Sequence, residues 1–80
     1  MLLNLYSVMD RVAECVMPPS TARNDAAALR QVDHSMAKAK FVDRSDYEVL
    51  FVGTFDDVTG VITPPDLGPR VVIPTVGGEE

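Results

Sequence analysis

The sequence has 80 residues, 46% of them hydrophobic, with one cysteine, one histidine and a net charge of −5 at pH 7. One cysteine excludes an internal disulfide, and one cysteine with one histidine excludes a structural zinc site, so we expect the small domain to be stabilised as a homo-oligomer, most simply a two-fold dimer. The negative total argues against non-specific binding of nucleic acid by the whole surface and leaves a local basic patch as the means of binding it.

A first β-strand is predicted at residues 3–9. Its alternation sends Leu3, Leu5 and Met9 to one face and Tyr6 and Val8 to the other. Both faces are partly apolar, as in a central strand or one that a partner covers. The apolar start has no cationic segment, so we expect neither a signal peptide nor a membrane span.

A second, weaker strand is predicted at residues 12–17, before Pro18 and Pro19 stop the pairing. It contains Cys15, which we interpret as a small buried hydrophobe kept reduced in the cytoplasm.

A helix is predicted from Asn24 to about Ala39. Asn24 is a good N-cap, and Leu29, Val32 and Met36 recur at helical spacing. This apolar stripe predicts that the helix packs on the sheet.

Residues 46–62 have the pattern of a β-hairpin. Alternation places Tyr47, Val49, Phe51 and Phe55 on one face, and residues 56–60 have the composition of a turn that ends at Gly60. The three aromatics on this face either pack beneath the helix or stack on bases.

The composition changes at Pro64, after which proline and glycine interrupt regular structure. Val71, Val72 and Ile73 are nevertheless β-branched, and we predict an extended arm that pairs with a sheet edge, its own or a neighbour's. The predicted fold class is α+β: a small antiparallel sheet in ββαββ order, one helix on one face, and an extended C-terminal arm. Residues 1–63 form the domain and residues 64–80 the arm.

No set of residues has the spacing of an enzyme site or a metal site. His34 is the only imidazole, no glycine-rich loop opens a helix, and the aspartates near the hairpin lack the spacing of a calcium loop. We therefore expect a protein that is not an enzyme and has no cofactor and no metal.

Basic residues follow one side of the predicted helix. Arg30, His34 and Lys38 lie opposite the apolar stripe, and Arg23 lies near the same side just before the N-cap. We call these four residues the basic ridge. Such a row of donors can follow a phosphate backbone, although a solvated helix face has the same pattern. Tyr6 is the aromatic most open to stacking on a base or to burial in a dimer interface.

Four blocks of sequence together carry a family resemblance. They are residues 6–10 with Ala13 and Glu14, the proline at Pro19, residues 24–30, and residues 46–56 with Thr59 and Gly60. Together they resemble the small nonstructural proteins of gokushoviruses, which are tailless single-stranded-DNA phages of the microvirus group. Ser20 and Thr54 stand where that family usually has an aromatic and an acidic residue. The resemblance implies a phage protein of the host bacterial cytoplasm that binds DNA or assists single-stranded genome synthesis, and it supplies no functional residues.

Two functions remain open. In the first, an oligomeric accessory protein engages single-stranded viral DNA, or the phage or host replication proteins on it, through the basic ridge and Tyr6. In the second, the protein is an oligomeric protein–protein interaction module without nucleic-acid contact, whose Val71–Val72–Ile73 arm adds a strand to a partner.

Overall fold

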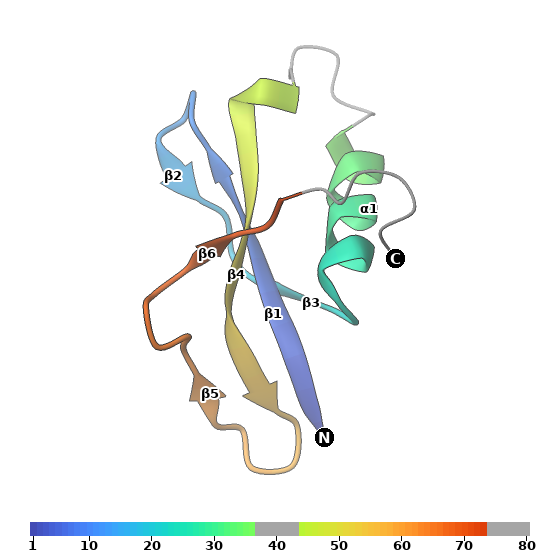
Figure 1. Cartoon of the computed structure of the whole chain (residues 1–80), viewed down its shortest axis with the longest axis vertical. Helices are drawn as coiled ribbons and strands as arrows, with labels where there is room; N and C mark the ends of the chain where they lie inside the picture. The colour runs from blue at the N-terminus through green and yellow to red at the C-terminus, as the bar shows by residue number, and fades with distance from the viewer. Residues whose placement is uncertain (37–43, 74–80) are drawn as a thin grey trace.

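The computed structural model describes residues 1–36 and 44–73, which form one helix and a curled antiparallel sheet (Figure 1). The elements in chain order are β1 (Leu2–Asp10), β2 (Cys15–Val16), β3 (Ser20–Ala22), α1 (Asp25–Met36), the 3-10 turn η1 (Arg44–Asp46), β4 (Tyr47–Asp56), β5 (Ile62–Thr63) and β6 (Arg70–Val71). The α+β class is confirmed. The order differs from the predicted ββαββ, because three strands precede the helix and three follow it.

Two long strands, β1 and β4, pair along their whole length at the centre of the sheet. Both β2 and β3 pair with the outer edge of β1, and both β5 and β6 pair with the outer edge of β4. The strands on each outer edge are short because prolines or glycines interrupt the chain between β2 and β3 and between β5 and β6. The predicted strand at residues 12–17 forms only at Cys15–Val16, after a turn, and Cys15 is exposed rather than buried.

A β-bulge changes the register between β1 and β4. Leu5 lies opposite Gly53 and Tyr6 lies opposite Phe51, so Val52 is an extra residue on β4. One extra residue reverses the faces of all side chains beyond it. Phe55 therefore shares a face with Leu3, opposite to the face of Phe51, and the predicted single row of aromatics on one face is wrong.

The core lies between α1 and one face of the sheet. It consists of Tyr6, Ala28, Leu29, Val49 and Val72. The N-terminus of α1 is capped as predicted: the Asn24 side-chain oxygen accepts a 2.8 Å hydrogen bond from the Ala27 amide. The described helix runs to Met36, and the predicted extension to Ala39 lies outside the described residues.

The chain after Pro64 folds back on its own sheet as far as Ile73. Arg70 and Val71 pair with β4, and the Val72 amide donates a 2.8 Å hydrogen bond to the Val49 carbonyl. Val72 is 3% exposed. The arm therefore pairs with the edge of its own sheet. Because the Val72 side chain is buried in this chain's core, it is not accessible for binding a partner chain.

Within the described residues, no helix is both long enough and apolar enough to cross a membrane.

Candidate nucleic-acid interface

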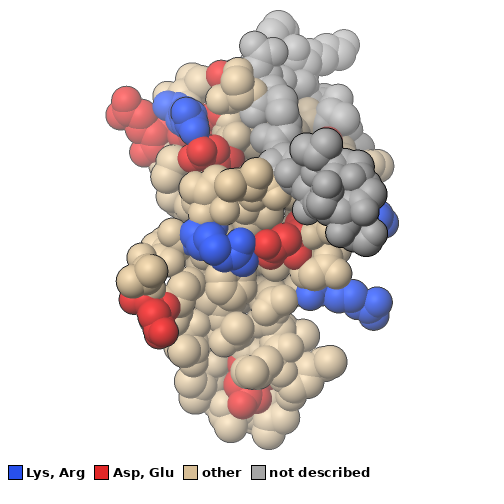
Figure 2. Space-filling view, in the orientation of Figure 1, with Lys and Arg blue, Asp and Glu red and all other residues tan. Residues whose placement is uncertain are grey.

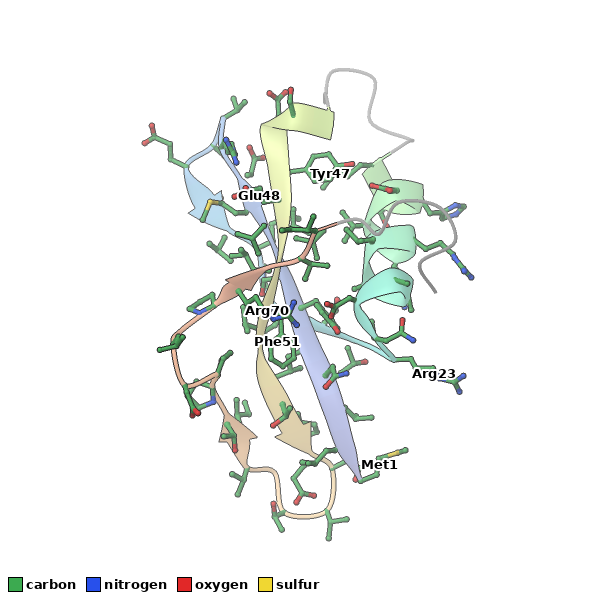
Figure 3. The ribbon with its side chains drawn as sticks, viewed as in Figure 1. Met1, Arg23, Tyr47, Glu48, Phe51 and Arg70 are labelled. Atoms are coloured by element: carbon green, nitrogen blue, oxygen red, sulfur yellow. The ribbon has the colours of Figure 1, made fainter. Side chains whose placement is uncertain are left out.

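The basic ridge is exposed wherever the structure describes it. Arg23 precedes α1, and Arg30 and His34 lie on the helix surface that faces away from the core. The Asn4 side-chain amide donates a 3.1 Å hydrogen bond to the Arg23 carbonyl and so ties this part of the backbone to β1. Arg23 projects away from the body of the molecule (Figure 3). Lys38 lies outside the described residues.

The arginines differ in whether a carboxylate neutralises them. Arg11 pairs with Glu48 at 2.6 Å and Arg70 with Asp25 at 3.0 Å. Neither Arg23 nor Arg30 forms an ion pair with any described residue. Figure 2 shows blue side chains at the edge of the molecule beside α1, apart from the blue and red pair at its centre. The uncompensated positive charge of the described surface is therefore on the ridge side of α1.

A groove of about 200 Å³ lies beside the ridge, between α1 and the segment at residues 17–22. Its apolar lining includes Val8, Met17, Pro18, Ala28 and Val32, and its polar groups include Ser20, Gln31 and Ser35. Among the described residues, no charged side chain lines it. Gln31 and Ser35 directly follow Arg30 and His34 in the helix, so the ridge borders the groove. An apolar groove with a few hydrogen-bonding groups can accept a flat neutral ring such as a nucleobase.

Tyr6 is part of the groove lining, but only 4% of it is exposed, so it does not stand out from the surface as a platform for stacking a base. Its hydroxyl donates a 2.7 Å hydrogen bond to Asp25 Oδ1, and its ring packs edge-to-face on Phe51 with the centroids 5.6 Å apart. The Arg70 guanidinium lies 5.0 Å from the centre of the Phe51 ring and also binds Asp25. These four side chains form the Tyr6–Asp25–Phe51–Arg70 cluster, which joins β1, α1, β4 and β6. Figure 3 labels two of them, Phe51 and Arg70, where β6 crosses β4.

Burial and hydrogen bonding fix the charges of this cluster. Burial, followed by the hydrogen bond to Asp25, raises the pKa of Tyr6 to about 12. Hydrogen bonds from Arg70 hold the pKa of Asp25 below its ordinary value, and the same contact raises the pKa of Arg70. At neutral pH the cluster therefore contains a neutral tyrosine, a carboxylate and a guanidinium. Its charges are matched internally, so it stabilises the fold and leaves the ridge as the surface that can attract an anion.

Sequence reasoning missed two features of this region. The pair formed by Asp25 and Arg70 spans 45 residues, and no local pattern indicates it. The groove needs β3 beside α1, and β3 follows two prolines that indicated only the end of a strand.

The family model described as phage ORF5 protein matches residues 3–76. No curated protein and no solved structure matches the chain. The matched range includes the ridge, the groove and the cluster.

Proposed function

Since the chain belongs to the phage ORF5 protein family, we propose that it is a non-enzymatic phage accessory protein that binds single-stranded viral DNA, or the replication machinery on it, during genome synthesis and packaging. The observation that carries the proposal is the pair of exposed arginines, Arg23 and Arg30, that no described carboxylate neutralises. The sequence resemblance to gokushovirus proteins supports a single-stranded-DNA phage and the host bacterial cytoplasm as the setting.

The ridge and the groove have complementary roles in this proposal. Arg23 and Arg30 contact backbone phosphates, as cationic side chains do in sequence-independent binding, and His34 donates a hydrogen bond beside them. The groove beside them accepts a base, whose faces contact apolar side chains while Gln31 and Ser35 offer hydrogen bonds at the rim. Lys38 contributes a further cation if the helix continues as its sequence predicts. The net charge of −5 keeps binding local, because the rest of the surface repels the phosphates.

The experiment that tests this function is a titration of a fluorescent single-stranded oligonucleotide, followed by anisotropy at low and near-physiological salt. Arg30→Glu should weaken binding at least tenfold. Arg11→Glu is the matched control, since it changes the net charge equally at an exposed arginine outside the ridge. Equal losses in both variants would show that the ridge is not the site. No binding by the unaltered protein at low salt would end the proposal of direct DNA contact.

A second oligonucleotide separates the groove from the ridge. A strand of the same length made of abasic nucleotides keeps every phosphate and lacks every base. If a base occupies the groove, the abasic strand should bind at least several-fold more weakly while keeping the same dependence on salt. Equal affinity for both strands would restrict the contact to phosphates.

The alternative function, protein–protein interaction, is favoured by one observation. Leu67, in the loop between β5 and β6, is 99% exposed, and Ile73 is 75% exposed. Deleting residues 64–80 is not a clean test of this function, because it removes Val72 from the core and Arg70 from the cluster. Leu67→Ser leaves both in place. Under this alternative, Leu67→Ser should lose capture of a phage or host replication protein that the unaltered protein retains.

A further inference from the structure

A second groove adjoins the groove beside the basic ridge, which we now call the first groove. The second groove has a volume of about 340 Å³ and is lined by the start of β1, residues 1–4, and by residues 21–23. Figure 3 labels two residues of this lining, Met1 at the start of β1 and Arg23 just before α1. Ala22 lines both grooves, so the two are neighbours.

The second groove forms because β3 covers only part of the outer edge of β1. β3 pairs with residues 4–6 and ends at Ala22, where the chain leaves the sheet to enter α1. No described strand pairs with residues 2–3 on that edge. The 3.1 Å hydrogen bond from the Asn4 side-chain amide to the Arg23 carbonyl holds the departing chain beside β1. The groove is therefore bounded by β1 on one side and by the chain entering α1 on the other.

The lining combines apolar side chains with a positive charge. Leu2, Leu3 and Ala22 are apolar, Thr21 offers a hydroxyl, and none of the described residues in the lining is acidic. Arg23 forms no ion pair with a described residue, and its side chain projects outward (Figure 3). A guanidinium binds phosphate through paired hydrogen bonds, and apolar side chains contact the faces of a base. A nucleotide, with an uncharged ring and an anionic phosphate, matches both parts of this lining.

The open edge of β1 is too short to bind a partner strand. Strands in proteins have about 3–10 residues, and only residues 2–3 of β1 are open here. A peptide added at this edge would gain few backbone hydrogen bonds. The charge and the size of the second groove therefore favour a nucleotide over a protein strand.

We propose that the second groove takes the base next to the one in the first groove, so that the phosphate between the two bases contacts Arg23. This assignment rests on the binding of single-stranded DNA proposed above. From Ser20 in the first groove to Arg23 in the second is three residues of extended chain, or about 10 Å. Neighbouring bases can span this distance once they are unstacked and splayed apart. Arg30, at the border of the first groove, then lies beside a further phosphate.

Anisotropy titrations with two thymidine strands of equal length test for adjacent base sites. One strand carries its bases in adjacent pairs, separated by pairs of abasic nucleotides, and the other alternates one base with one abasic nucleotide. Both have the same number of bases and phosphates, so a single groove would bind them equally. With two adjacent grooves the paired strand should bind at least about fivefold more tightly, because only this strand fills both. Equal affinities would overturn the proposal.

Thr21→Glu tests whether the second groove causes the difference between the two strands. Thr21 is exposed and lines the second groove but not the first, so a carboxylate at this position repels a nucleotide in the second groove. The ratio of the two affinities should fall to about one, while the alternating strand still binds more tightly than a wholly abasic strand. A ratio that Thr21→Glu leaves unchanged would contradict the assignment.

Val58→Glu is the matched control for the added charge. Val58 is 81% exposed in the turn between β4 and β5 and lines neither groove. The variant should keep the fivefold ratio, and an equal loss of the ratio in both variants would overturn the proposal. Far-UV circular dichroism shows whether Thr21→Glu folds. If it does not, the comparison of the two strands on the unaltered protein still decides the outcome.

A strand with a base at every position separates this proposal from the proposed function. If that strand binds more tightly than the wholly abasic strand, but the paired and alternating strands bind equally, DNA binding stands and the second groove takes no base. If that strand does not bind at low salt, both the function and the second base site are excluded.

Discussion

The Tyr6 hydroxyl in β1 donates a 2.7 Å hydrogen bond to the Asp25 carboxylate in the first turn of α1. The same carboxylate binds Arg70 of β6 at 3.0 Å, so one side chain joins the first strand, the helix and the last strand. A contact of this kind holds the helix on the sheet and returns the chain after Pro64 to its own domain.

Tyr6→Phe should lower the free energy of unfolding by about 1–2 kcal/mol, because it removes a hydrogen bond to a charged acceptor and leaves the ring packing in place. Urea unfolding followed by circular dichroism measures this loss. A double-mutant cycle with Asp25→Asn should show coupling between the two sites. Additive losses would mean that the hydroxyl and the carboxylate do not interact.

Tyr6 should ionise late in an alkaline titration. Its pKa is about 12 in the folded chain and 10.0 in an ordinary tyrosine. The stability that it contributes is therefore fully present below pH 10 and is lost as the pH rises toward 12, because the unfolded chain ionises first. Absorbance at 295 nm should show an ionisation near pH 12 that Tyr6→Phe removes. If the variant keeps that step, Tyr6 is not the late group.

Asp25 should contribute stability with the opposite dependence on pH. Arg70 lowers its folded pKa below the ordinary 3.8, so its contribution is present above that pH and is lost as the pH falls through the folded pKa. The difference in unfolding free energy between the unaltered protein and Asp25→Asn should be largest near pH 7 and should narrow below pH 3.8. The effect is modest, since both side chains are about half exposed. A difference that does not change with pH would contradict this assignment.

Gly53→Ala should be much more destabilising than Gly68→Ala. Both glycines have a positive φ, 144° at Gly53 and 84° at Gly68, so alanine strains the backbone at either position. A Cβ at Gly53 would also collide with the Thr63 carbonyl oxygen, whereas nothing lies within 4 Å of one at Gly68. We expect a loss of about 1 kcal/mol at Gly68 and about 3 kcal/mol or more at Gly53. Thermal unfolding of both variants makes the comparison, and similar losses would mean that β5 does not pack against Gly53.

The salt dependence of DNA binding should show how many phosphates the basic ridge contacts. Removing one phosphate contact from a single strand lowers the slope of log K against log salt concentration by about 0.7. Arg30→Gln and Arg23→Gln should each lower it by about this amount, and Arg11→Gln should leave it unchanged. Anisotropy titrations at four or five salt concentrations give the slope. An unchanged slope in the two ridge variants would exclude these arginines as phosphate contacts.

Local chemistry was readable from the sequence alone. Asn24 caps the helix, Asp56 and Gly60 form the turn of the hairpin, and the first strand runs within one residue of its predicted ends. The cap and the turn depend on side chains that bond to backbone within a few residues, and the strand shows in the alternation of adjacent side chains, so the local sequence suffices to predict all three. The exposed positions of Arg30 and His34 follow in the same way from helical periodicity.

The tertiary structure decided which distant segments meet. The bulge at Val52 turned Phe55 to the other face, and isolated Gly53 was the only sequence signal for it. The burial of Tyr6, the pair of Asp25 with Arg70 and the place of Val72 in its own core all depend on contacts between residues far apart in the chain. Periodicity specifies which face a side chain occupies, but strand register and the choice of partner depend on how the whole chain packs.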